Sequence, residues 1–323
     1  MRIVSVTEPG GPENLFITEA APPFAAPGEV LVAVHAAGVN RADLLQRQGF
    51  YPPPPGASDI IGLEVAGAIV ELGEGVHGWA IGDECVALLA GGGYAEYVNV
   101  PAGQVIRPPA GIDLISAGGL IEAAATVLSN FDHVHLKAGE TVLIHGGTGG
   151  VGTFAIQYAK AIGARVLTTA GSAEKLELCR ELGADEAFDY HDDWVAAVAE
   201  TTAGKGVDVI LDVIGAKYLE SNVASLALDG RLVVIGLQGG RKATLDLNAL
   251  LVKRATVTAT SLRGRPVAQK AAIAAAVAER VWPLVTAGAI KPPRETRFRL
   301  ADVAQAHALL ASGENIGKVI LTM

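Results

Sequence analysis

The stretch HGGTGGVG, His145 to Gly152, places five glycines in eight residues. It directly follows the apolar run TVLI and directly precedes the helical pattern TFAIQYAKAIG. Glycine permits positive φ and lets another group approach the backbone closely, at a cost of about 0.5 to 1 kcal/mol per residue inside regular structure. A turn alone does not require so many glycines. We therefore expect a ligand to use the space that the missing side chains leave.

Within this stretch, Gly147 to Gly152 fits the pattern G-x-G-x-x-G at the junction of a buried strand and a helix. In such a corner the glycines allow a tight turn, the backbone approach of a pyrophosphate and close packing of helix on strand. The helix N-terminus adds unpaired N–H groups and a partial positive charge of about half an electron. The pattern predicts a dinucleotide site, and a glycine-rich turn without a ligand is the alternative. The residues assigned to this site are Gly147, Gly149, Gly150, Val151 and Gly152.

The end of the next strand distinguishes the two nicotinamide dinucleotides. An NAD site carries Asp or Glu there, whose carboxylate binds the ribose 2′-hydroxyl and would repel a 2′-phosphate. This chain has TTAGSAEK, in which Gly171 and Ser172 bring no carboxylate and Lys175 adds a cation near the start of a helix. We therefore predict NADPH as the cofactor. In the alternative interpretation Ser172 only caps the helix and Lys175 only faces solvent.

The pattern of the chain changes near Gly118. Up to about Pro109, short β-rich runs such as EVLVAVHAAGV are separated by Gly and Pro, which predicts a compact, mostly β unit. Beyond Gly118, short apolar runs alternate with helical patterns, which predicts a doubly wound domain with a parallel sheet. Six strands complete that sheet, so we expect the tail with its last strand KVILTM to return to the first domain. The prediction is an α/β protein with domains at 1–119 plus 285–323 and at 120–284.

Composition limits the possible partners. The chain has 323 residues, of which 50% are hydrophobic and 18% charged, as in soluble proteins of about two domains. A net charge of −9 without a Lys/Arg cluster argues against nucleic acid. No apolar run approaches the ~20 residues of a membrane helix, and the N-terminus has no signal-peptide pattern, so we expect a cytoplasmic protein without a membrane partner.

The two cysteines, Cys85 and Cys179, lack C-x-x-C spacing and are expected to be buried thiols.

Several motifs together resemble the quinone oxidoreductases of the medium-chain dehydrogenase/reductase superfamily, in particular the branch with zeta-crystallin and the p53-inducible quinone oxidoreductase. These motifs include GVNRADLLQRQGFYPPPPGAS, LIHGGTGGVGTFAIQYAKAIGA, LALDGRLVVIGL and NIGKVIL, and they extend over nearly the whole chain. The resemblance implies a GroES-like catalytic domain made from both chain ends and a Rossmann domain inserted between them. It also implies an active site in the cleft between the domains and a homodimer joined along the Rossmann sheets.

The resemblance further implies roles for single residues. Asn40 and Tyr51 would lie near the nicotinamide and the substrate as catalytic residues, whereas a turn-stabilising amide and a packed wall are the alternatives. Thr126 would contact the nicotinamide, but the preceding GGLIEAAA lacks a proline that is common in the family. Tyr190 would either join Ser172 and Lys175 in the 2′-phosphate pocket or only close a strand end. The other cofactor-binding residues implied are Asn40, Gly171, Gly236, Leu237, Leu262, Arg263 and Asn315.

Candidate metal ligands are few. Catalytic zinc takes about three N, S or O ligands from the protein. Leu63 precedes Glu64 where zinc-dependent relatives carry histidine, and two cysteines cannot form a four-cysteine site, so we expect no metal. Without a metal Lewis acid, an acceptor that is already electrophilic is the easier substrate.

This reasoning favours NADPH-dependent quinone reduction, with the proton supplied by water or by Tyr51. One alternative is an NADPH-dependent reductase for the C=C bond of 2-alkenals or enones. Another is a non-catalytic NADPH-binding protein that acts by binding a partner protein or RNA.

Overall fold

The computed structural model describes all residues from 1 to 323, which form two compact units. Unit 1 consists of Met1–Ala125 together with Leu262–Met323, and unit 2 consists of Thr126–Ser261. The first unit is therefore made from both ends of the chain. None of the helices is long and apolar enough to cross a membrane.

Unit 1 is built on a seven-stranded sheet with the order β14-β15-β3-β4-β5-β7, in which β6 also pairs with β3. The last strand of the chain pairs antiparallel with β3 and parallel with β14, so it becomes an inner strand of this sheet. A two-stranded antiparallel sheet, β1-β2, accompanies it. The strands are β1 (Arg2–Val6), β2 (Leu15–Glu19), β3 (Glu29–Val39), β4 (Glu64–Leu72), β5 (Glu84–Leu88), β6 (Tyr97–Pro101), β7 (Val105–Ile106), β14 (Glu295–Arg299) and β15 (Lys318–Thr322).

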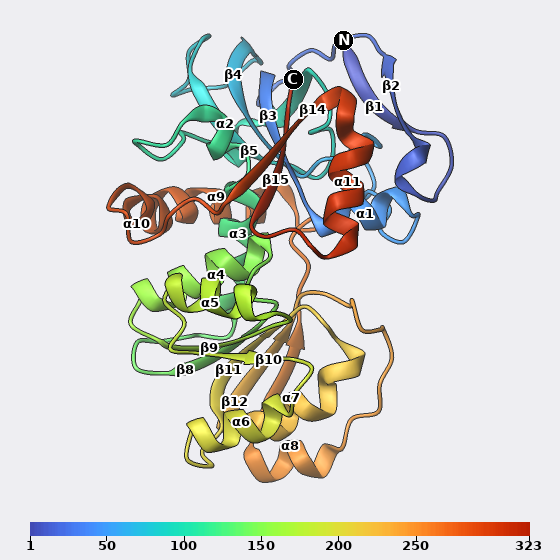
Figure 1. Ribbon diagram of the computed structural model, residues 1–323. Coiled ribbons are helices and arrows are strands. Elements are labelled where there is room, and N and C mark those ends of the chain that lie inside the picture. Colours follow the sequence, from blue (N-terminus) through green and yellow to red (C-terminus); the bar gives the residue numbers. More distant parts are fainter. The chain divides into compact units, whose positions relative to one another are not determined.

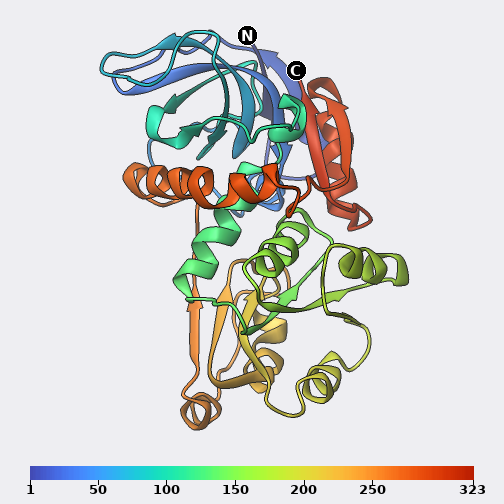
Figure 2. The ribbon, with the colours of Figure 1, turned by 90° about the vertical axis from the view of Figure 1, so that its left-hand side faces the viewer.

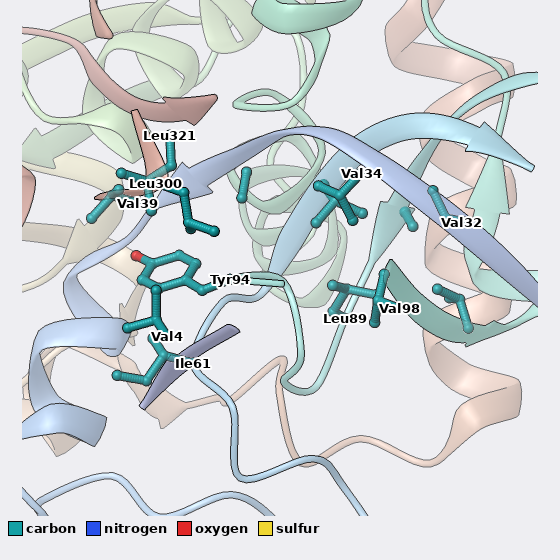
Figure 3. Packing of buried hydrophobic residues seen from close by; sticks show 14 of the residues in the cluster. Val4, Val32, Val34, Val39, Ile61, Leu89, Tyr94, Val98, Leu300 and Leu321 are labelled. Carbon is teal, nitrogen blue, oxygen red and sulfur yellow. The ribbon is translucent and has the colours of Figure 1, made fainter. Parts of the chain in front are cut away.

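The core of unit 1 is rich in β-branched side chains, as the strand patterns require. Figure 3 shows the Tyr94 ring among apolar side chains that include Val4, Ile61 and Leu300. The hydroxyl of this buried tyrosine has polar partners, which are described with the site. The aliphatic core thus encloses a polar group in the middle of the unit.

The helices of unit 1 flank its sheet. In Figure 2, α11 lies along β14 and β15, against which it packs. A long C-terminal helical segment comprises α9, a π-helical turn at Val277–Val281, and α10, whose first turn contains Pro283. The helices are α1 (Arg41–Arg47), α2 (Leu114–Ala117), α9 (Val267–Ala276), α10 (Trp282–Thr286) and α11 (Val303–Ser312), with short 3-10 turns at Pro12–Asn14 (η1), Ala102–Gln104 (η2) and Leu300–Asp302 (η5).

The segment α9–α10 packs within unit 1. A Cβ on Gly103 of η2 would lie only 2.9 Å from the Ala271 methyl group, and the Trp282 indole N–H donates to the Arg107 carbonyl at 2.9 Å. The compact unit therefore takes in residues that the sequence pattern assigns to the Rossmann domain. The predicted domain boundaries, 1–119 plus 285–323 and 120–284, stay a prediction.

Unit 2 contains a six-stranded parallel sheet with the order β10-β9-β8-β11-β12-β13. Helices α4 and α5 cover one face, and α6, α7 and α8 cover the other (Figure 1). The strands are β8 (Thr141–His145), β9 (Arg165–Ala170), β10 (Glu186–Asp189), β11 (Val207–Asp212), β12 (Leu226–Val234) and β13 (Thr256–Ala259). The helices are α3 (Ile121–His133), which starts in unit 1, α4 (Gly150–Ala161), α5 (Ala173–Glu181), α6 (Trp194–Thr201), α7 (Leu219–Ser225) and α8 (Leu247–Lys253), with a 3-10 turn at Ala216–Tyr218 (η3).

The strand order reverses between β8 and β11, which are neighbours in space. In open α/β sheets, ligands bind outside the carboxyl ends of the strands at such a switch point. The glycine-rich stretch follows β8 and therefore lies at this position. The predicted fold class, a mostly β unit with a doubly wound parallel-sheet unit, is confirmed.

Candidate functional site

The corner from β8 to α4 depends on glycine at three positions. Gly146 has φ +76°, in the left-handed region that favours glycine. A Cβ on Gly147 would collide with the Thr168 hydroxyl, and a Cβ on Gly152 would collide with the Gly146 carbonyl oxygen. Gly147 and Gly152 thus permit packing of helix on strand. Gly149, the N-cap of α4, is exposed, and a Cβ there would meet only the Gly146 oxygen at 3.8 Å.

The exposed side of this corner is suited to an anion. The first N–H groups of a helix have no partner inside the helix, so Gly150, Val151 and Gly152 present donors at the start of α4. The helix dipole adds positive charge there. The structure therefore brings the five residues assigned to the pyrophosphate site into one strand-to-helix turn at the switch point.

A buried histidine lies at this end of the sheet and contacts two other elements. The His145 Nδ1 atom lies 3.0 Å from the Thr169 hydroxyl, and Nε2 lies 2.8 Å from Asn222 Oδ1. Burial lowers the pKa of His145 to about 4, against an opposing contribution from Asn222, so the ring is neutral at pH 7. An amide oxygen only accepts hydrogen bonds, so Nε2 carries the proton and Nδ1 accepts from Thr169. The ring thereby joins β8 to β9 and to α7.

The corner from β9 to α5 has no carboxylate at Gly171 or Ser172, and its nearest acidic residue is Glu174 in the first turn of α5. Ser172 is the N-cap of α5, and its Oγ accepts from the Lys175 backbone N–H at 3.3 Å. The Tyr190 phenol stands over Gly171, where a Cβ would collide with its hydroxyl. Tyr190 is 46% exposed, and its ring centroid lies 4.4 Å from that of His191. Ser172 therefore caps the helix, as the alternative interpretation expects, and its hydroxyl hydrogen remains a donor toward solvent.

The next two loops at the carboxyl edge of the sheet are also held by the fold. Asp212 accepts from the backbone N–H groups of Ile214 at 2.7 Å and Gly215 at 2.9 Å, and burial raises its pKa to about 6. Gly236 lies against this loop, because a Cβ there would come within 2.7 Å of the Val213 oxygen. Leu237 is half exposed beside it. The predicted cofactor residues Gly236 and Leu237 thus follow β12 at the same edge of the sheet.

Unit 1 contains a buried ion pair next to Asn40. The Lys318 ammonium lies 2.5 Å from Glu64 Oε1 and donates to Asn40 Oδ1 at 2.7 Å. Asn40 Nδ2 in turn donates to Glu64 Oε1 at 2.9 Å, and the Glu122 backbone N–H donates to Glu64 Oε2 at 2.9 Å. A Cβ on Gly38 would collide with the Glu64 carboxylate, so β3 requires glycine at this point. The side chain of Asn40 therefore has one orientation, fixed by a cation on one side and an anion on the other.

A second buried chain of polar groups starts from the Asn40 backbone. The Asn40 N–H donates to Asp43 Oδ2 at 2.7 Å, and the Tyr94 hydroxyl lies 3.0 Å from the same oxygen and 3.1 Å from His307 Nε2. Arg47 Nη1 lies 3.4 Å from His307 Nδ1. Burial, with a smaller effect of Arg47, lowers the pKa of His307 to about 3, so the ring is neutral. Arg47 can only donate, so His307 Nδ1 accepts its hydrogen bond. The neutral ring then donates from Nε2 to the Tyr94 hydroxyl, which in turn donates to Asp43.

Burial also changes the acidity of carboxyl groups here. It raises the pKa of Asp43 to about 7, although hydrogen bonds from Asn40 and Tyr94 oppose it. The Oδ1 atom of Asp43 is buried without a hydrogen-bond partner. Burial raises the pKa of Glu122 to about 8, and the negative charge of Glu64 adds to this effect. Burial therefore disfavours the ionised forms of both Asp43 and Glu122.

The remaining predicted residues lie in different surroundings. Tyr51 follows α1 and is half-buried, with the Arg263 guanidinium 5.2 Å from its ring centroid. Thr126 lies in α3, where its carbonyl accepts from Asn130 at 2.8 Å. Asn315 donates to the Gly317 carbonyl at 3.0 Å, and its Oδ1 is buried without a partner. Leu262 is buried where the chain re-enters unit 1. The catalytic role of Tyr51 and the cofactor roles of Thr126, Asn315 and Leu262 stay predictions.

Two family models match the chain. One, described as an alcohol dehydrogenase GroES-like domain, matches residues 26–110, and another, described as a zinc-binding dehydrogenase, matches residues 150–278. A quinone oxidoreductase of Rattus norvegicus is 33% identical, with 100% of this chain and 98% of that protein covered. The Escherichia coli quinone oxidoreductase complexed with NADPH is 30% identical, with a TM-score of 0.91 and full coverage of both chains.

The chain belongs to the quinone oxidoreductase family of the medium-chain dehydrogenase/reductase superfamily. It is therefore an oxidoreductase, and the resemblance seen in its motifs is confirmed. The CurK enoyl reductase is also similar, at 26% identity with a TM-score of 0.88 and coverage of 100% of this chain and 99% of that chain.

The name of the second family model raises the question of zinc. Both oxygens of Glu64 are taken by Lys318, Asn40 and the Glu122 N–H, and its neighbour Leu63 offers no ligand atom. Burial raises the pKa of Cys85 to about 12 and that of Cys179 to about 11, and the two thiols lie in different units. The His, Cys, Asp and Glu side chains form no group of three that could hold a metal ion. These residues do not fit a zinc site.

Sequence reasoning did not single out Lys318, Tyr94 or His307. Lys318 stands in the NIGKVIL motif that carries the resemblance, so the motif was a usable signal. Tyr94 and His307 lie 213 positions apart and meet only through the return of the tail. Nothing in their local sequence indicates that they meet.

Proposed function

We propose that this oxidoreductase reduces quinones with NADPH and needs no metal ion. One observation carries the proposal: beside the glycine corner, the β9–α5 turn presents Ser172, Lys175 and Tyr190, and no carboxylate stands between the end of β9 and the start of α5, with Glu174 the acidic residue in the first turn of α5. A carboxylate at this turn would repel a 2′-phosphate, whereas hydroxyl and ammonium groups bind one. The similarity to a quinone oxidoreductase complexed with NADPH supports the same choice.

The residues present fit this cofactor. The glycine corner leaves open space where the pyrophosphate would approach the N–H groups of Gly150, Val151 and Gly152. The Ser172 hydroxyl and the Lys175 ammonium would bind the 2′-phosphate, and the Tyr190 phenol would line the same pocket. Asn315 stays a proposed cofactor residue, and its Oδ1 atom is buried without a hydrogen-bond partner in unit 1.

When bound, NADPH would supply a hydride, and the acceptor quinone then needs one proton to become the hydroquinone. Overall, NADPH, one proton and a quinone give NADP⁺ and a hydroquinone. In this proposal Asn40, held by Lys318 and Glu64, orients the acceptor, and Tyr51 or water delivers the proton. A quinone is already electrophilic, so a metal Lewis acid is not required to polarise it.

The test compares two acceptors at equal NADPH. Phenanthrenequinone and a medium-chain 2-alkenal are offered to the purified protein, and kcat/KM is measured for each from NADPH oxidation. We expect the quinone to be the better substrate by about tenfold or more, equivalent to about 1.4 kcal/mol in transition-state binding. Faster turnover of the alkenal would replace the proposal.

The second candidate is reduction of the C=C bond of enals or enones. The similarity to CurK enoyl reductase favours it, because hydride delivery to a β-carbon uses the same kind of site. The acceptor comparison distinguishes the two functions, and product analysis of the alkenal reaction for the saturated aldehyde confirms the second.

We also propose a homodimer through unit 2. Strand β13 forms one end of the parallel sheet, so one of its edges has no neighbouring strand. Helix α8, which precedes it, exposes Leu247, Leu251 and Val252, with 71%, 74% and 57% of their surfaces accessible. Light scattering should report a dimer for the native protein and a monomer for the double variant Leu247→Glu/Leu251→Glu. A native monomer, or a variant dimer, would reject this interface. Cytoplasmic location and the absence of nucleic-acid or membrane partners stay predictions.

A further inference from the structure

The side chain of Arg263 is buried in unit 1, with 3% of its surface exposed, and each of its nitrogens donates to a different segment. Nε donates to the Ala90 carbonyl at 2.7 Å, Nη1 to the Tyr51 carbonyl at 3.0 Å, and Nη2 to Gln46 Oε1 at 2.7 Å. Burial lowers the pKa of Arg263, but a guanidinium stays charged in proteins. A buried charged group needs hydrogen-bond partners, and loss of any of these three acceptors would be costly. Arg263 therefore holds the segments of Gln46, Tyr51 and Ala90 together.

Gln46 extends this contact to a second point. Its Oε1 accepts from Arg263, and its Nε2 donates to the Asp59 carbonyl at 2.9 Å. A guanidinium only donates, so Arg263 fixes which end of the Gln46 amide faces Asp59. Arg263 thus holds Tyr51 directly and Asp59 through Gln46. These two residues are the ends of the loop YPPPPGASD, residues 51–59, which we call the proline loop.

The proline loop depends on such anchors. Its four consecutive prolines, residues 52–55, have no backbone N–H group and cannot donate hydrogen bonds to the rest of the protein. Within the loop, the Ala57 N–H bonds back to the Pro54 carbonyl at 3.0 Å. Pro restricts φ, so the loop is stiff, and its position is determined mainly at its two ends.

Arg263 also positions the ring of Tyr51. The guanidinium carbon lies 5.2 Å from the ring centroid, a cation–π contact. The backbone bond to the Tyr51 carbonyl and this ring contact act on the same residue, so Tyr51 is held at two points by one side chain.

We propose that Arg263 is a positioning residue for the acceptor substrate: it fixes the Tyr51 ring and both ends of the proline loop, and it does not act as a ligand of the coenzyme. The proposal rests on the proposed quinone reduction, in which Tyr51 lies beside the acceptor. It differs from the cofactor contact that the family resemblance implies for Arg263. The ligand whose binding depends on the position of this loop is, by chemical class, a planar, electrophilic quinone.

The test measures acceptor and coenzyme separately in Arg263→Gln, Arg263→Lys and Gln46→Ala. For Arg263→Gln we expect KM for phenanthrenequinone to rise about tenfold or more, while the NADPH Kd from fluorescence titration stays within about twofold. Arg263→Lys should lie between wild type and Arg263→Gln, because lysine keeps the charge but loses the fork of donors. Arg241→Gln, at an exposed arginine of unit 2, is the matched control and should leave both values unchanged.

Gln46→Ala keeps Arg263 in place, so it decides the outcome if Arg263→Gln does not fold. It should also raise KM for phenanthrenequinone. The double variant Arg263→Gln/Gln46→Ala should have a KM no higher than that of Arg263→Gln alone, because the two residues act as one unit. A loss of NADPH affinity as large as the rise in KM would make Arg263 a coenzyme ligand. Unchanged KM in Gln46→Ala and Arg263→Lys would overturn the proposal.

A readout without turnover separates this proposal from the proposed function. Hydrogen exchange of the amides of residues 56–59 should be faster in Arg263→Lys and Gln46→Ala than in wild type, whether or not quinones are reduced. If wild-type protein reduces no quinone but exchange is faster in the variants, only the proposed function fails. If exchange in this loop is unchanged, Arg263 does not hold the ends of the proline loop, and the proposal made here is refuted.

Discussion

Lys318 and Glu64 form an ion pair in the interior of unit 1, with Nζ and Oε1 2.5 Å apart and only 3% and 0% of the two side chains exposed. Asn40 bridges the pair, accepting from the lysine and donating to the glutamate. A buried pair of this kind is stable only when each charge keeps its partners. The pair therefore fixes Asn40, and removal of one member leaves a charge without compensation.

Lys318→Met should accordingly be strongly destabilising. It leaves the Glu64 carboxylate buried without its cation, which costs about 3 to 5 kcal/mol in the free energy of unfolding. Urea unfolding at pH 7 measures this cost. The double variant Lys318→Met/Glu64→Gln should recover part of the loss, because no charge is then left unpaired. Equal stability of Lys318→Met and wild type would show that the pair is not closed to water in solution.

Asp43→Asn tests the buried polar chain through the pH dependence of stability. The pKa of Asp43 is raised from 3.8 to about 7 in the folded protein, so the folded state binds more protons than the unfolded state between these values. The contribution of Asp43 therefore makes the protein less stable as pH rises from about 4 to 7. Asn cannot titrate, so the Tm of Asp43→Asn relative to wild type should increase from pH 5 to pH 8. A constant difference in Tm across this range would mean that Asp43 titrates normally.

Lys175→Ala tests the choice of coenzyme. Loss of a hydrogen bond to a charged group should weaken NADPH binding by about 1.5 to 3 kcal/mol and leave NADH binding nearly unchanged, because NADH lacks the 2′-phosphate. Titration of nicotinamide fluorescence with both coenzymes measures the difference. Lys242→Ala, at an exposed lysine of unit 2, serves as the control. Similar losses for NADPH and NADH would remove Lys175 from the phosphate site.

Two glycine variants separate packing from ligand approach. Gly152→Ala places a methyl group against the Gly146 carbonyl and should lower stability by about 1 to 3 kcal/mol. Gly149→Ala has open space and a φ of −75° that alanine adopts readily, so it should lower stability less than Gly152→Ala, by the small cost of alanine at an N-cap, and weaken NADPH binding by obstructing the phosphate. Thermal unfolding and NADPH titration of both variants distinguish the two effects. The opposite pattern would contradict the geometry assigned to the corner.

Much of unit 2 follows from local sequence. The glycines between β8 and α4, and the alternation of short apolar runs with helical patterns, predict the parallel sheet and its ligand edge because each strand and helix is contiguous in the chain. The absence of a carboxylate after β9 is likewise a local feature. The glycine corner therefore lies where the sequence predicts it.

Unit 1 is different because its polar groups come from distant segments. Lys318 contacts Asn40 across 278 positions, and Arg263 contacts Gln46 across 217. The motifs indicate Asn40, Lys318 and Arg263 one at a time, but local sequence does not indicate which of these residues meet, because the return of the tail brings them together. The position of α9–α10 in unit 1 has the same origin, since its helical pattern does not indicate the unit on which it packs.

The most direct test of the central claim is the rate of NADPH oxidation with phenanthrenequinone after exhaustive treatment of the purified protein with a metal chelator. The account predicts turnover at the rate of the untreated protein, with NADPH preferred over NADH. Loss of turnover on chelation, restored by added zinc, would contradict it. Failure of every quinone tested to serve as an acceptor for NADPH oxidation would contradict it too.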